Sequence, residues 1–258
     1  MDDAIVIGSG PNGLVAAATL ARAGWSVRVL EAQPRPGGAL YSLETTLPGY
    51  LHDVGAAFFP FAHWSPAFRQ LHLDEVGLRW AAGVYESAHP GLDDACPTIA
   101  RDVERAAATF GPDADAWRWL ATWQARMGPQ LADALLAPLP ALRPALSLGL
   151  ANLLRFARAG LTTAAEYSRS LFRTEAARRV IPGLSLHVDL GPHDFGGAPL
   201  GLVLALLAAG SGFQVPIGGA RAITHALLTR LHEANGHLQL GTRVTNIVVR
   251  RGRGVAVR

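Results

Sequence analysis

The sequence predicts an α/β fold, in which a mainly helical segment is inserted into a domain built around a parallel sheet. Strand, turn, helix and strand patterns follow one another within residues 4–31. Helical patterns then dominate residues 98–210, and strand patterns return between residues 238 and 257. We therefore expect residues 1–97 to form the first part of an α/β domain, residues 98–210 a helical domain, and residues 211–258 an incomplete return to the first domain.

The first α/β unit is predicted from a short series of local signals. Residues 4–7 are a continuous apolar run, as expected for a parallel strand buried on both faces. Pro11 suits the first position of a helix, residues 14–23 are rich in Ala and Leu, and Gly24 supplies a stop. Residues 26–30 then return as a second strand. Together these elements have the size of one βαβ unit, about thirty residues.

The middle of the chain carries helical signals without a sheet pattern. Residues 101–127 have a helical pattern with a break at Gly111 and Pro112, and residues 151–159 are helical again. Thr163 and Glu166 have the spacing of a capping box, and residues 202–209 form a further apolar helix. We expect this helical domain to contact the substrate.

The last part of the chain predicts a return to sheet structure. Residues 213–217 are extended, Gly218 and Gly219 form a turn, and residues 220–234 form an amphipathic helix that ends at Asn235. Three strand patterns follow, at residues 238–240, 243–250 and 255–257.

Composition excludes several classes of function. Half of the 258 residues are hydrophobic and 17% are charged, which argues against extended disorder. All 23 basic residues are arginine, so a P-loop lysine and a Schiff-base lysine are both absent. The single cysteine, Cys96, excludes an internal disulfide and paired redox thiols. The net charge is +3, and the basic cluster at residues 250–253 fits a solvated turn better than a nucleic-acid surface, so we expect no nucleic-acid partner.

The location of the protein is predicted from its termini and apolar runs. The chain begins with two aspartates after Met1, unlike the basic start of a secretory signal. The longest uncharged apolar run, residues 199–210, is too short to span a bilayer. We therefore expect a cytoplasmic protein.

The chemistry is concentrated in the motif Gly8-Ser9-Gly10-Pro11-Asn12-Gly13, a GxGxxG sequence between the first strand and the first helix. Gly8 permits the tight turn, Gly10 lets the backbone approach a pyrophosphate, and Gly13 allows the helix to pack closely on the strand. The helix N-terminus then offers free N–H groups to the phosphates. This context predicts a Rossmann-type site for a dinucleotide.

Two features downstream identify the dinucleotide. Glu31 closes the second strand, where its carboxylate can accept both hydroxyls of the adenosine ribose and would repel the 2′-phosphate of NADP. The pair Gly37 and Gly38 follows, and a glycine backbone can lie against the phosphates or the flavin side of the cofactor. This pair favours FAD over NAD. Ala32 and Ala39 border these two features and complete the predicted cofactor contacts in this part of the chain.

Residues 5–39 resemble the extended dinucleotide-binding signature of the FAD-dependent amine oxidase and phytoene desaturase superfamily. The variant at residues 8–14, with Leu-Pro-Gly-Tyr-Leu-His-Asp-Val-Gly at residues 47–55, is most similar to phytoene dehydrogenase-related oxidoreductases. A third match is Val-Pro-Ile-Gly-Gly-Ala at residues 215–220, followed by a helix and Gly-Thr-Arg-Val at residues 241–244. By this resemblance Val244 contacts the adenine through its backbone.

The resemblance implies an FAD-dependent oxidoreductase that removes hydride from a C–H bond of an apolar substrate, for which an isoprenoid is one candidate. Hydride would pass to flavin N5, while the protein orients the substrate and excludes water. The resemblance assigns no catalytic acid or base, and the sequence predicts no metal. Two alternatives stay open, a flavin amine oxidase and a non-catalytic FAD-binding fragment.

The chain departs from the family in two respects. Family members continue with a late glycine-rich segment that touches the flavin, so a missing C-terminal half or a second polypeptide is expected to complete the flavin site. Some relatives have Arg after the glycine pair, whereas this chain has Ala39, which removes one contact to the phosphate or flavin.

Other candidate residues have two interpretations each. His52 with Asp53, and His187 with Asp189, lack the third partner of a catalytic triad and the spacing of a metal site. The first pair suits a turn near the flavin as well as acid–base work. The tryptophans at positions 117, 119 and 123 suit a helix core or an aromatic cage. The apolar stretch at residues 131–161, with Arg143, Arg155 and Arg158, suits a lid that rests on a membrane surface, or a domain core.

Overall fold

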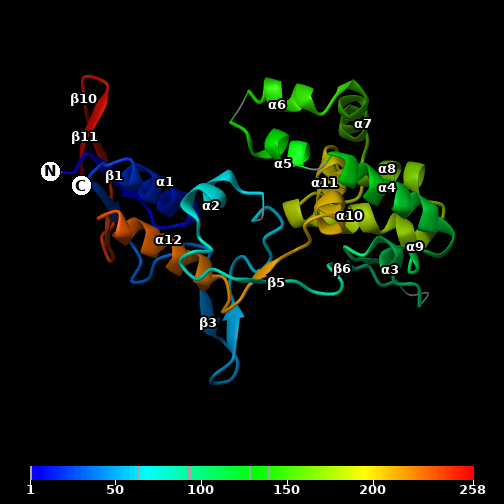
Figure 1. Cartoon of the computed structure of the whole chain (residues 1–258), viewed down its shortest axis with the longest axis horizontal. Helices are drawn as coiled ribbons and strands as arrows, with labels where there is room; N and C mark the ends of the chain where they lie inside the picture. The colour runs from blue at the N-terminus through cyan, green and yellow to red at the C-terminus, as the bar shows by residue number, and fades with distance from the viewer. Residues whose placement is uncertain (1, 63, 92–93, 128, 139) are drawn as a thin grey trace. The chain divides into compact units, whose positions relative to one another are not determined.

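The structure is a computed structural model that describes every residue except Met1, His63, Leu92, Asp93, Gly128 and Leu139 (Figure 1). The chain forms two compact units. Unit 1 comprises Met1–Phe59, Pro66–Ala81 and Val215–Arg258, and unit 2 comprises Pro60–Ser65 and Ala82–Gln214. The domain limits that the sequence predicts, at residues 97 and 210, stay a prediction.

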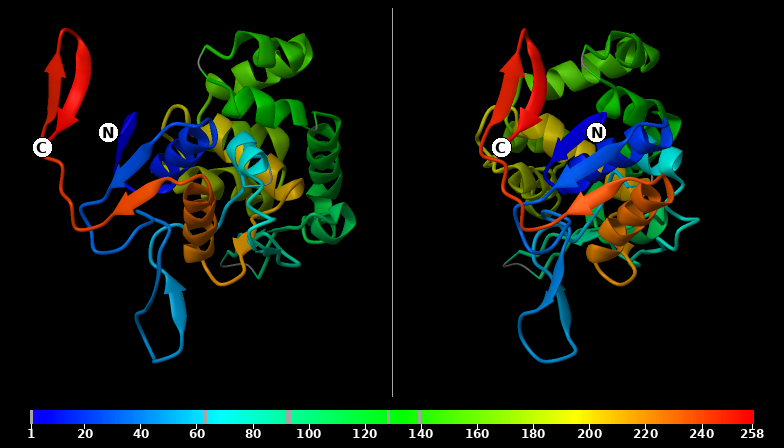
Figure 2. Two further views of the ribbon diagram at one scale, coloured as in Figure 1. Left: turned by 60° about the vertical axis from the view of Figure 1, so that its left-hand side comes forward. Right: turned by 90° about the vertical axis from the view of Figure 1, so that its left-hand side faces the viewer.

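Unit 1 is built on a three-stranded parallel sheet of β1 (Ala4–Ile7), β2 (Val27–Leu30) and β9 (His237–Gln239), in the order β1-β2-β9. Ala4 pairs with Val27, and Arg28 pairs with His237. Figure 2 shows these three arrows running in one direction. The helices α1 (Pro11–Arg22) and α12 (Arg221–Glu233) pack against each other beside this sheet. The α/β, Rossmann-type fold predicted from the sequence is confirmed.

The core of unit 1 explains which face of each element is apolar. The helix α1 buries Leu14, Ala17, Ala18 and Ala21, which recur at helical spacing on one side. Val27 and Val29 of β2 join the same cluster, whereas Ile5 and Ile7 of β1 are 39% and 48% exposed. The prediction that β1 is buried on both faces is therefore wrong for this chain, because only one face of the sheet is covered by the described helices.

The remaining elements of unit 1 are short. The helix α2 covers Pro66–Leu71. Antiparallel pairs are formed by β3 (Ser42–Glu44) with β4 (Leu51–Asp53), by β5 (Trp80–Ala81) with β8 (Val215–Pro216), and by β10 (Ile247–Arg250) with β11 (Arg253–Val257). The red hairpin β10–β11 projects away from the parallel sheet (Figure 2). Its turn places Arg251 and Gly252 at positive φ, so the basic cluster is a turn, as predicted.

Unit 2 is a helical assembly around one buried helix. The helix α11 (Gly197–Ala209) is apolar on all sides and packs against four other helices, α4 (Ala114–Met127), α7 (Leu150–Gly160), α8 (Ala164–Leu171) and α10 (Val180–Ser185). The other elements are α3 (Val103–Ala107), α5 (Pro129–Leu136), α6 (Leu142–Ser147), α9 (Glu175–Arg178), the 3₁₀ turns η1 (Gly111–Asp113) and η2 (Leu186–Val188), and the strand pair β6 (Ser87–Ala88) with β7 (Thr98–Ile99).

Local signals in unit 2 form as the sequence predicts. Thr163 and Glu166 make both hydrogen bonds of the capping box at the start of α8. Of the three tryptophans in α4, Trp117 and Trp123 are buried in the core, while Trp119 is 44% exposed. In the described part of the chain, every helix is too short or too polar to cross a membrane.

Candidate functional site

The turn between β1 and α1 has the geometry that its glycines predict. Gly8 has a φ of +93°, which favours glycine, and a Cβ on Gly13 would lie 2.2 Å from the Gly8 carbonyl oxygen. A Cβ on Gly10, in contrast, would have no heavy atom within 4 Å. Gly13 is therefore required for packing inside the turn, whereas Gly10 borders open space on its outside.

The N-terminus of α1 is free to bind an anion. Gly10 is the N-cap residue and offers no side chain to the first turn, in which Pro11 and Asn12 stand and no acidic residue occurs. The first N–H groups of a helix have no acceptor within the helix, and the helix dipole favours negative charge there. The open space beside Gly10 thus adjoins the α1 N-terminus, as phosphate binding requires.

The Glu31 carboxylate is held at this turn by hydrogen bonds from the glycine motif and from the residues that follow β2. The amide and hydroxyl of Ser9 donate to Oε2 of Glu31 over 2.8 and 2.7 Å. The amide of Gln33 donates to Oε1 over 2.8 Å. A carboxylate accepts about four hydrogen bonds in all, so the protein itself satisfies most of the Glu31 acceptor positions.

These donors also keep Glu31 charged. Burial acts to raise the pKa of the Glu31 carboxyl, since only 9% of the residue is exposed. The hydrogen bonds from the amides of Gln33 and Ser9 and from the Ser9 hydroxyl outweigh burial, so that the pKa lies below its ordinary value. Near neutral pH the site therefore presents a fixed anion, which suits a sugar hydroxyl and disfavours a 2′-phosphate.

The second glycine loop lies directly against the first. The amide of Gly37 donates to the Ser9 carbonyl over 3.0 Å, and a Cβ on Gly38 would lie 3.0 Å from the Gly10 Cα atom. Both residues have positive φ, of 110° and 58°. Glycine is needed at this close approach to the first loop, and the two loops together border the space next to Gly10, while the predicted contact of the glycine pair with the cofactor stays a prediction.

A third loop meets the residue after the glycine pair. The amide of Ala56 donates to the Ala39 carbonyl over 3.1 Å, and a Cβ on Gly55 would come within 2.4 Å of the same oxygen. Gly55 ends the Leu-Pro-Gly-Tyr-Leu-His-Asp-Val-Gly segment of the sequence. The structure thus brings three glycine-containing loops, distant in sequence, to one edge of unit 1.

The helix α12 fixes these loops from the side. The Thr224 hydroxyl donates to the Leu40 carbonyl over 2.9 Å, and Oδ1 of Asp53 accepts from the Ser42 hydroxyl over 2.5 Å and from the Ala220 amide over 2.8 Å. Asp53 therefore joins the β3–β4 hairpin to the start of α12. This structural role leaves its oxygen engaged and favours the turn over acid–base work for the pair His52 and Asp53.

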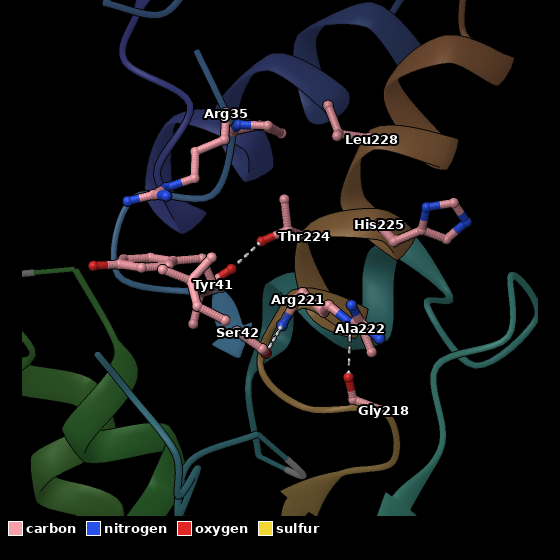
Figure 3. A pocket seen from close by; sticks show the side chains of 12 residues that line it. Arg35, Tyr41, Ser42, Gly218, Arg221, Ala222, Thr224, His225 and Leu228 are labelled. Atoms are coloured by element: carbon pink, nitrogen blue, oxygen red, sulfur yellow. Dashed lines mark hydrogen bonds between the residues drawn. The ribbon is translucent and has the colours of Figure 1, made fainter. Parts of the chain in front are cut away.

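A cavity of about 520 Å³ lies between α12 and residues 35–43. Figure 3 shows Thr224 on α12 at one side of it and Arg35 above Tyr41. The Arg35 guanidinium lies 4.3 Å from the centre of the Tyr41 ring. The cavity adjoins the glycine-pair loop on the α12 side, while the residues that line it come from 35–43 and 218–228, outside the Gly8–Gly13 turn.

The segment after β9 returns to the backbone of residues 31–33, and the adenine contact of Val244 stays a prediction. The amide of Thr242 donates to the Glu31 carbonyl over 2.8 Å, and the amide of Gly241 donates to the Gln33 carbonyl over 3.2 Å. Val244 follows two residues later and is half-buried. The predicted strand at residues 243–250 begins only at Ile247, while the amides of Thr245 and Asn246 donate to the Arg258 carbonyl.

Other sequence candidates have local surroundings of their own. His52 shares a 2.7 Å hydrogen bond with Thr46. His187 lies in η2 and Asp189 at its end, in unit 2. Within the described residues, no group of three or more His, Cys, Asp or Glu side chains could hold a metal ion.

Sequence reasoning did not identify two residues that organise the site. Ser9 is an unspecified position of the GxGxxG motif, yet it is fully buried and supplies two of the three hydrogen bonds to Glu31 described above. Thr224 stands on the buried face of α12, where nothing in the sequence distinguishes it from a core residue. The presence of a hydroxyl side chain inside the glycine motif was the one sequence signal that could have identified Ser9.

Comparison with known proteins confirms the dinucleotide-binding domain. The family model of the NAD(P)-binding Rossmann-like domain matches residues 6–72. A 1-hydroxycarotenoid 3,4-desaturase from Flavobacterium sp. is 40% identical over 74 residues, which are 29% of this chain and 15% of that protein. Putrescine oxidase from Kocuria rosea is 41% identical over 78 residues, or 30% and 15% of the two chains. One component of the limonene dehydrogenase from Castellaniella defragrans is 31% identical over 103 residues, or 40% and 18%.

Solved structures share the fold over almost the whole chain. An oxidoreductase from Methanosarcina mazei has a TM-score of 0.60 at 18% identity, and the match covers 98% of this chain and 54% of that one. Putrescine oxidase has a TM-score of 0.56 at 21% identity, over 94% and 51% of the chains. A Rab GDI from Plasmodium falciparum has a TM-score of 0.58 at 14% identity, over 100% and 62%.

The chain therefore spans about half the length of the oxidoreductase structures that it resembles. The resemblance to carotenoid desaturases and amine oxidases seen in the sequence is confirmed by the similar proteins found. The similar folds include both oxidoreductases and a Rab GDI, so the fold alone does not decide an activity.

Proposed function

We propose that this chain is the FAD-binding part of an oxidoreductase that removes hydride from a C–H bond of an apolar substrate. The observation that carries the proposal is the open space beside Gly10, next to the α1 N-terminus and Gly38, together with the charged Glu31 bonded to the neighbouring Ser9. A dinucleotide needs this combination: donors and no side chain at its phosphates, and an acceptor at its ribose.

The residues present fit the adenosine diphosphate half of FAD. The backbone from Gly10 to Gly13, with Pro11 and Asn12, would hold the pyrophosphate, and Glu31 with Ala32 would hold the ribose. Gly37, Gly38 and Ala39 would line the path toward the flavin, and Val244 would meet the adenine. When bound, FAD supplies a hydride acceptor, which no side chain of the protein can replace.

The substrate class is proposed from the relatives. A desaturase named for a hydroxycarotenoid and a dehydrogenase named for limonene are among the proteins that this chain matches. Both named molecules are isoprenoids, so their C–H bonds lie in apolar surroundings. The helical unit 2, which is rich in buried and exposed leucines, would supply apolar contacts that orient such a molecule and exclude water.

A flavin amine oxidase is the second candidate. Putrescine oxidase and (S)-6-hydroxynicotine oxidase match the chain at 41% and 40% identity, about as well as the desaturase. The matched segments are short, and desaturases and amine oxidases would share a cofactor site, so these matches do not choose between the two classes. A protein that binds FAD without turning over a substrate is the third candidate, since the fold alone does not decide an activity.

The spectrum of the purified protein tests these candidates. The full chain is reconstituted with FAD, freed of excess by gel filtration, and mixed without oxygen with limonene, with a hydroxycarotenoid or with putrescine. We expect retained flavin absorbance near 450 nm, roughly the usual flavin band, and bleaching by an isoprenoid only. Bleaching by putrescine, with hydrogen peroxide formed on admission of air, would establish the amine oxidase instead.

Flavin that is retained but bleached by none of these compounds would favour the non-catalytic binder. A colourless protein after reconstitution would contradict FAD binding itself. A Gly10→Ala variant serves as the control, because it removes only the space proposed for the pyrophosphate.

A further inference from the structure

Side chains of α4 and α7 line a small cavity in unit 2, with a volume of about 280 Å³. The α4 residues that line it include positions 119, 122, 123 and 126, and a spacing of three and four residues places them on one side of the helix. The α7 residues are positions 152 and 155, which are again three apart. We call this cavity the arginine–tryptophan pocket. It is lined by Trp119, Thr122, Trp123, Arg126, Asn152 and Arg155, with Arg118 beside them.

A network of hydrogen bonds holds Arg155 in the arginine–tryptophan pocket. Oδ1 of Asn152 accepts from the indole nitrogen of Trp123 over 2.8 Å and from Nη1 of Arg155 over 3.1 Å, and Nδ2 of Asn152 donates to the Leu148 carbonyl over 2.9 Å. The guanidinium also lies 5.6 and 5.5 Å from the ring centres of Trp119 and Trp123. Arginine carries five N–H donors. Arg155 is therefore positioned by the protein and still has donors to offer a ligand.

The charge of the pocket is positive. Arg118 is neutralised by two carboxylates, since its Nη2 lies 2.7 Å from Glu104 and its Nη1 lies 2.8 Å from Asp115. Arg126 and Arg155, in contrast, form no ion pair within the described residues. The described residues that line the pocket include no aspartate or glutamate. Two guanidinium groups from two helices thus favour an anionic ligand.

The pocket also offers a flat apolar surface. Trp119 and Trp123 are stacked, with ring centres 5.5 Å apart and planes inclined by 30°. Trp123 is 5% exposed, belongs to the core of unit 2 and contacts Phe156, whereas Trp119 is 44% exposed. The buried ring therefore supports the exposed one, and the exposed part of the Trp119 indole can pack against a flat ring of a ligand.

We propose that the arginine–tryptophan pocket binds a small aromatic acid. The acid group, a carboxylate or a phosphate, would accept from Arg126, Arg155 and the Thr122 hydroxyl, because charge-assisted bonds to guanidinium groups are strong and directional. The ring would pack on Trp119. The volume lies near the lower end of small-molecule sites, roughly 300–1,000 Å³, which suits one or two rings and excludes a dinucleotide. The proposal does not rest on FAD binding, since every lining residue belongs to unit 2.

Isothermal titration calorimetry of the full 258-residue chain tests the proposal with four probes. The probes 2-naphthoate and 2-naphthyl phosphate carry the same ring with the two kinds of acid group. The probe 2-naphthamide keeps the ring and removes the charge. Cyclohexanecarboxylate keeps the charge and replaces the flat ring with a saturated one.

Three variants remove the proposed contacts one at a time, Arg126→Gln, Arg155→Gln and Trp119→Leu. The matched control is Arg158→Gln, because Arg158 is an exposed arginine of α7 that lies outside the pocket. Far-UV circular dichroism and thermal melts check the fold of each variant. Arg126 is exposed, so Arg126→Gln tests the pocket even if the loss of Arg155 disturbs the stacked indoles.

We expect at least one of the two naphthyl acids to bind the native chain with a Kd below about 1 mM, and the tighter of the two identifies the acid group. Each pocket-arginine variant should weaken this binding about tenfold, since a hydrogen bond between charged groups is lost. Trp119→Leu, and likewise the saturated probe, should weaken it about two- to tenfold through loss of the aromatic contact. The Arg158→Gln control should bind like the native chain.

Three results would overturn the proposal. The native chain could bind neither naphthyl acid. Arg158→Gln could lose as much affinity as Arg126→Gln, which would attribute binding to the general positive charge of α7. The uncharged naphthamide could bind as tightly as naphthoate, which would show an apolar site with no preference for an anion.

Discussion

Ser9 and Glu31 are 22 residues apart in the chain and are joined by two hydrogen bonds, from the Ser9 amide and from its hydroxyl, to the same oxygen of Glu31. The glycine-rich turn at the end of β1 and the acidic residue at the end of β2 are thereby locked together. The protein's own hydrogen bonds therefore hold the proposed phosphate-binding and ribose-binding halves of the site next to each other.

Replacing Glu31 with glutamine should weaken both the fold and cofactor binding. The amide group of glutamine would place N–H donors against the donors of Ser9 or Gln33, so we expect a loss of about 1–3 kcal/mol in the free energy of unfolding. FAD affinity should fall about tenfold or more, because a hydrogen bond to a charged acceptor is lost at the ribose. Urea unfolding and titration of the apoprotein with FAD measure these effects separately.

The exposed Glu44→Gln substitution is the control for that pair of measurements. It removes a carboxylate from the β3–β4 hairpin and should change neither quantity. Unchanged FAD affinity in Glu31→Gln would count against the assignment of this residue to the ribose.

Asp113 gives unit 2 an acid-sensitive element. Its carboxylate accepts from the amides of Arg173 and Thr174 and from the Thr174 hydroxyl, over 2.6–2.8 Å. Burial acts to raise the pKa of Asp113, but the Thr174 hydroxyl and these amides lower it below the ordinary value. Because the folded pKa is depressed, this stabilisation is complete above the unfolded pKa, about 3.9, and is lost as pH falls through the folded value.

Asp113→Asn should therefore reduce the free energy of unfolding by about 2–3 kcal/mol near neutral pH, since a buried donor loses its partner. The difference from the native chain should shrink as the pH falls below about 4. Urea unfolding across this pH range provides the test, with Asp133→Asn at an exposed site as the control. A constant difference at every pH would contradict the proposed ionisation.

His89 should destabilise the fold on mild acidification. Burial, reinforced by the nearby His187, lowers the pKa of His89 to about 4. The unfolded chain then binds a proton at higher pH than the folded chain does. The stabilisation contributed by the neutral ring is thus complete above about 6.5 and declines as pH falls toward the folded pKa.

A His89→Gln variant should show a flatter stability profile between pH 6.5 and 4, near the ordinary and lowered pKa values of the ring. Thermal melts in buffers across this range give the profile. His72→Gln, at a ring that is 55% exposed, is the matched control. An equally steep profile in both variants would show that another group controls acid sensitivity.

The sequence predicted those parts of the site whose structure is determined by residues close together in the chain. Gly8 and Gly13 stand where a positive φ and a close carbonyl oxygen demand glycine, and both constraints are local to one turn. The capping box at Thr163 formed for the same reason. Such features depend on a few neighbouring residues, so they can be predicted without knowledge of the rest of the fold.

Long-range contacts were not predictable in this way. Asp53 caps the start of α12 through the Ala220 amide, 167 residues later in the chain, and Thr224 bonds to the Leu40 carbonyl across 184 residues. A polar residue with such a distant partner looks, in the sequence, like any other polar residue. The exposure of Ile5 and Ile7 was missed for a related reason, because an apolar run does not reveal whether both faces of its sheet are covered.

Two glycine variants of the turn distinguish an effect on stability from an effect on cofactor binding. A Gly13→Ala side chain would collide with the Gly8 carbonyl at 2.2 Å, so this variant should lose stability, by roughly 1–3 kcal/mol for an overpacked position. A Gly10→Ala side chain would meet nothing within 4 Å, and the φ of −64° at this position suits alanine. Gly10→Ala should therefore fold as the native chain does.

Titration of the Gly10→Ala apoprotein with FAD is the most direct test of the proposed cofactor site. If the pyrophosphate runs through the open space beside Gly10, the new methyl group should lower FAD affinity at least about tenfold, while the urea unfolding curve stays that of the native chain. Native FAD affinity in this variant would contradict the site, since the phosphates could not then lie against that turn.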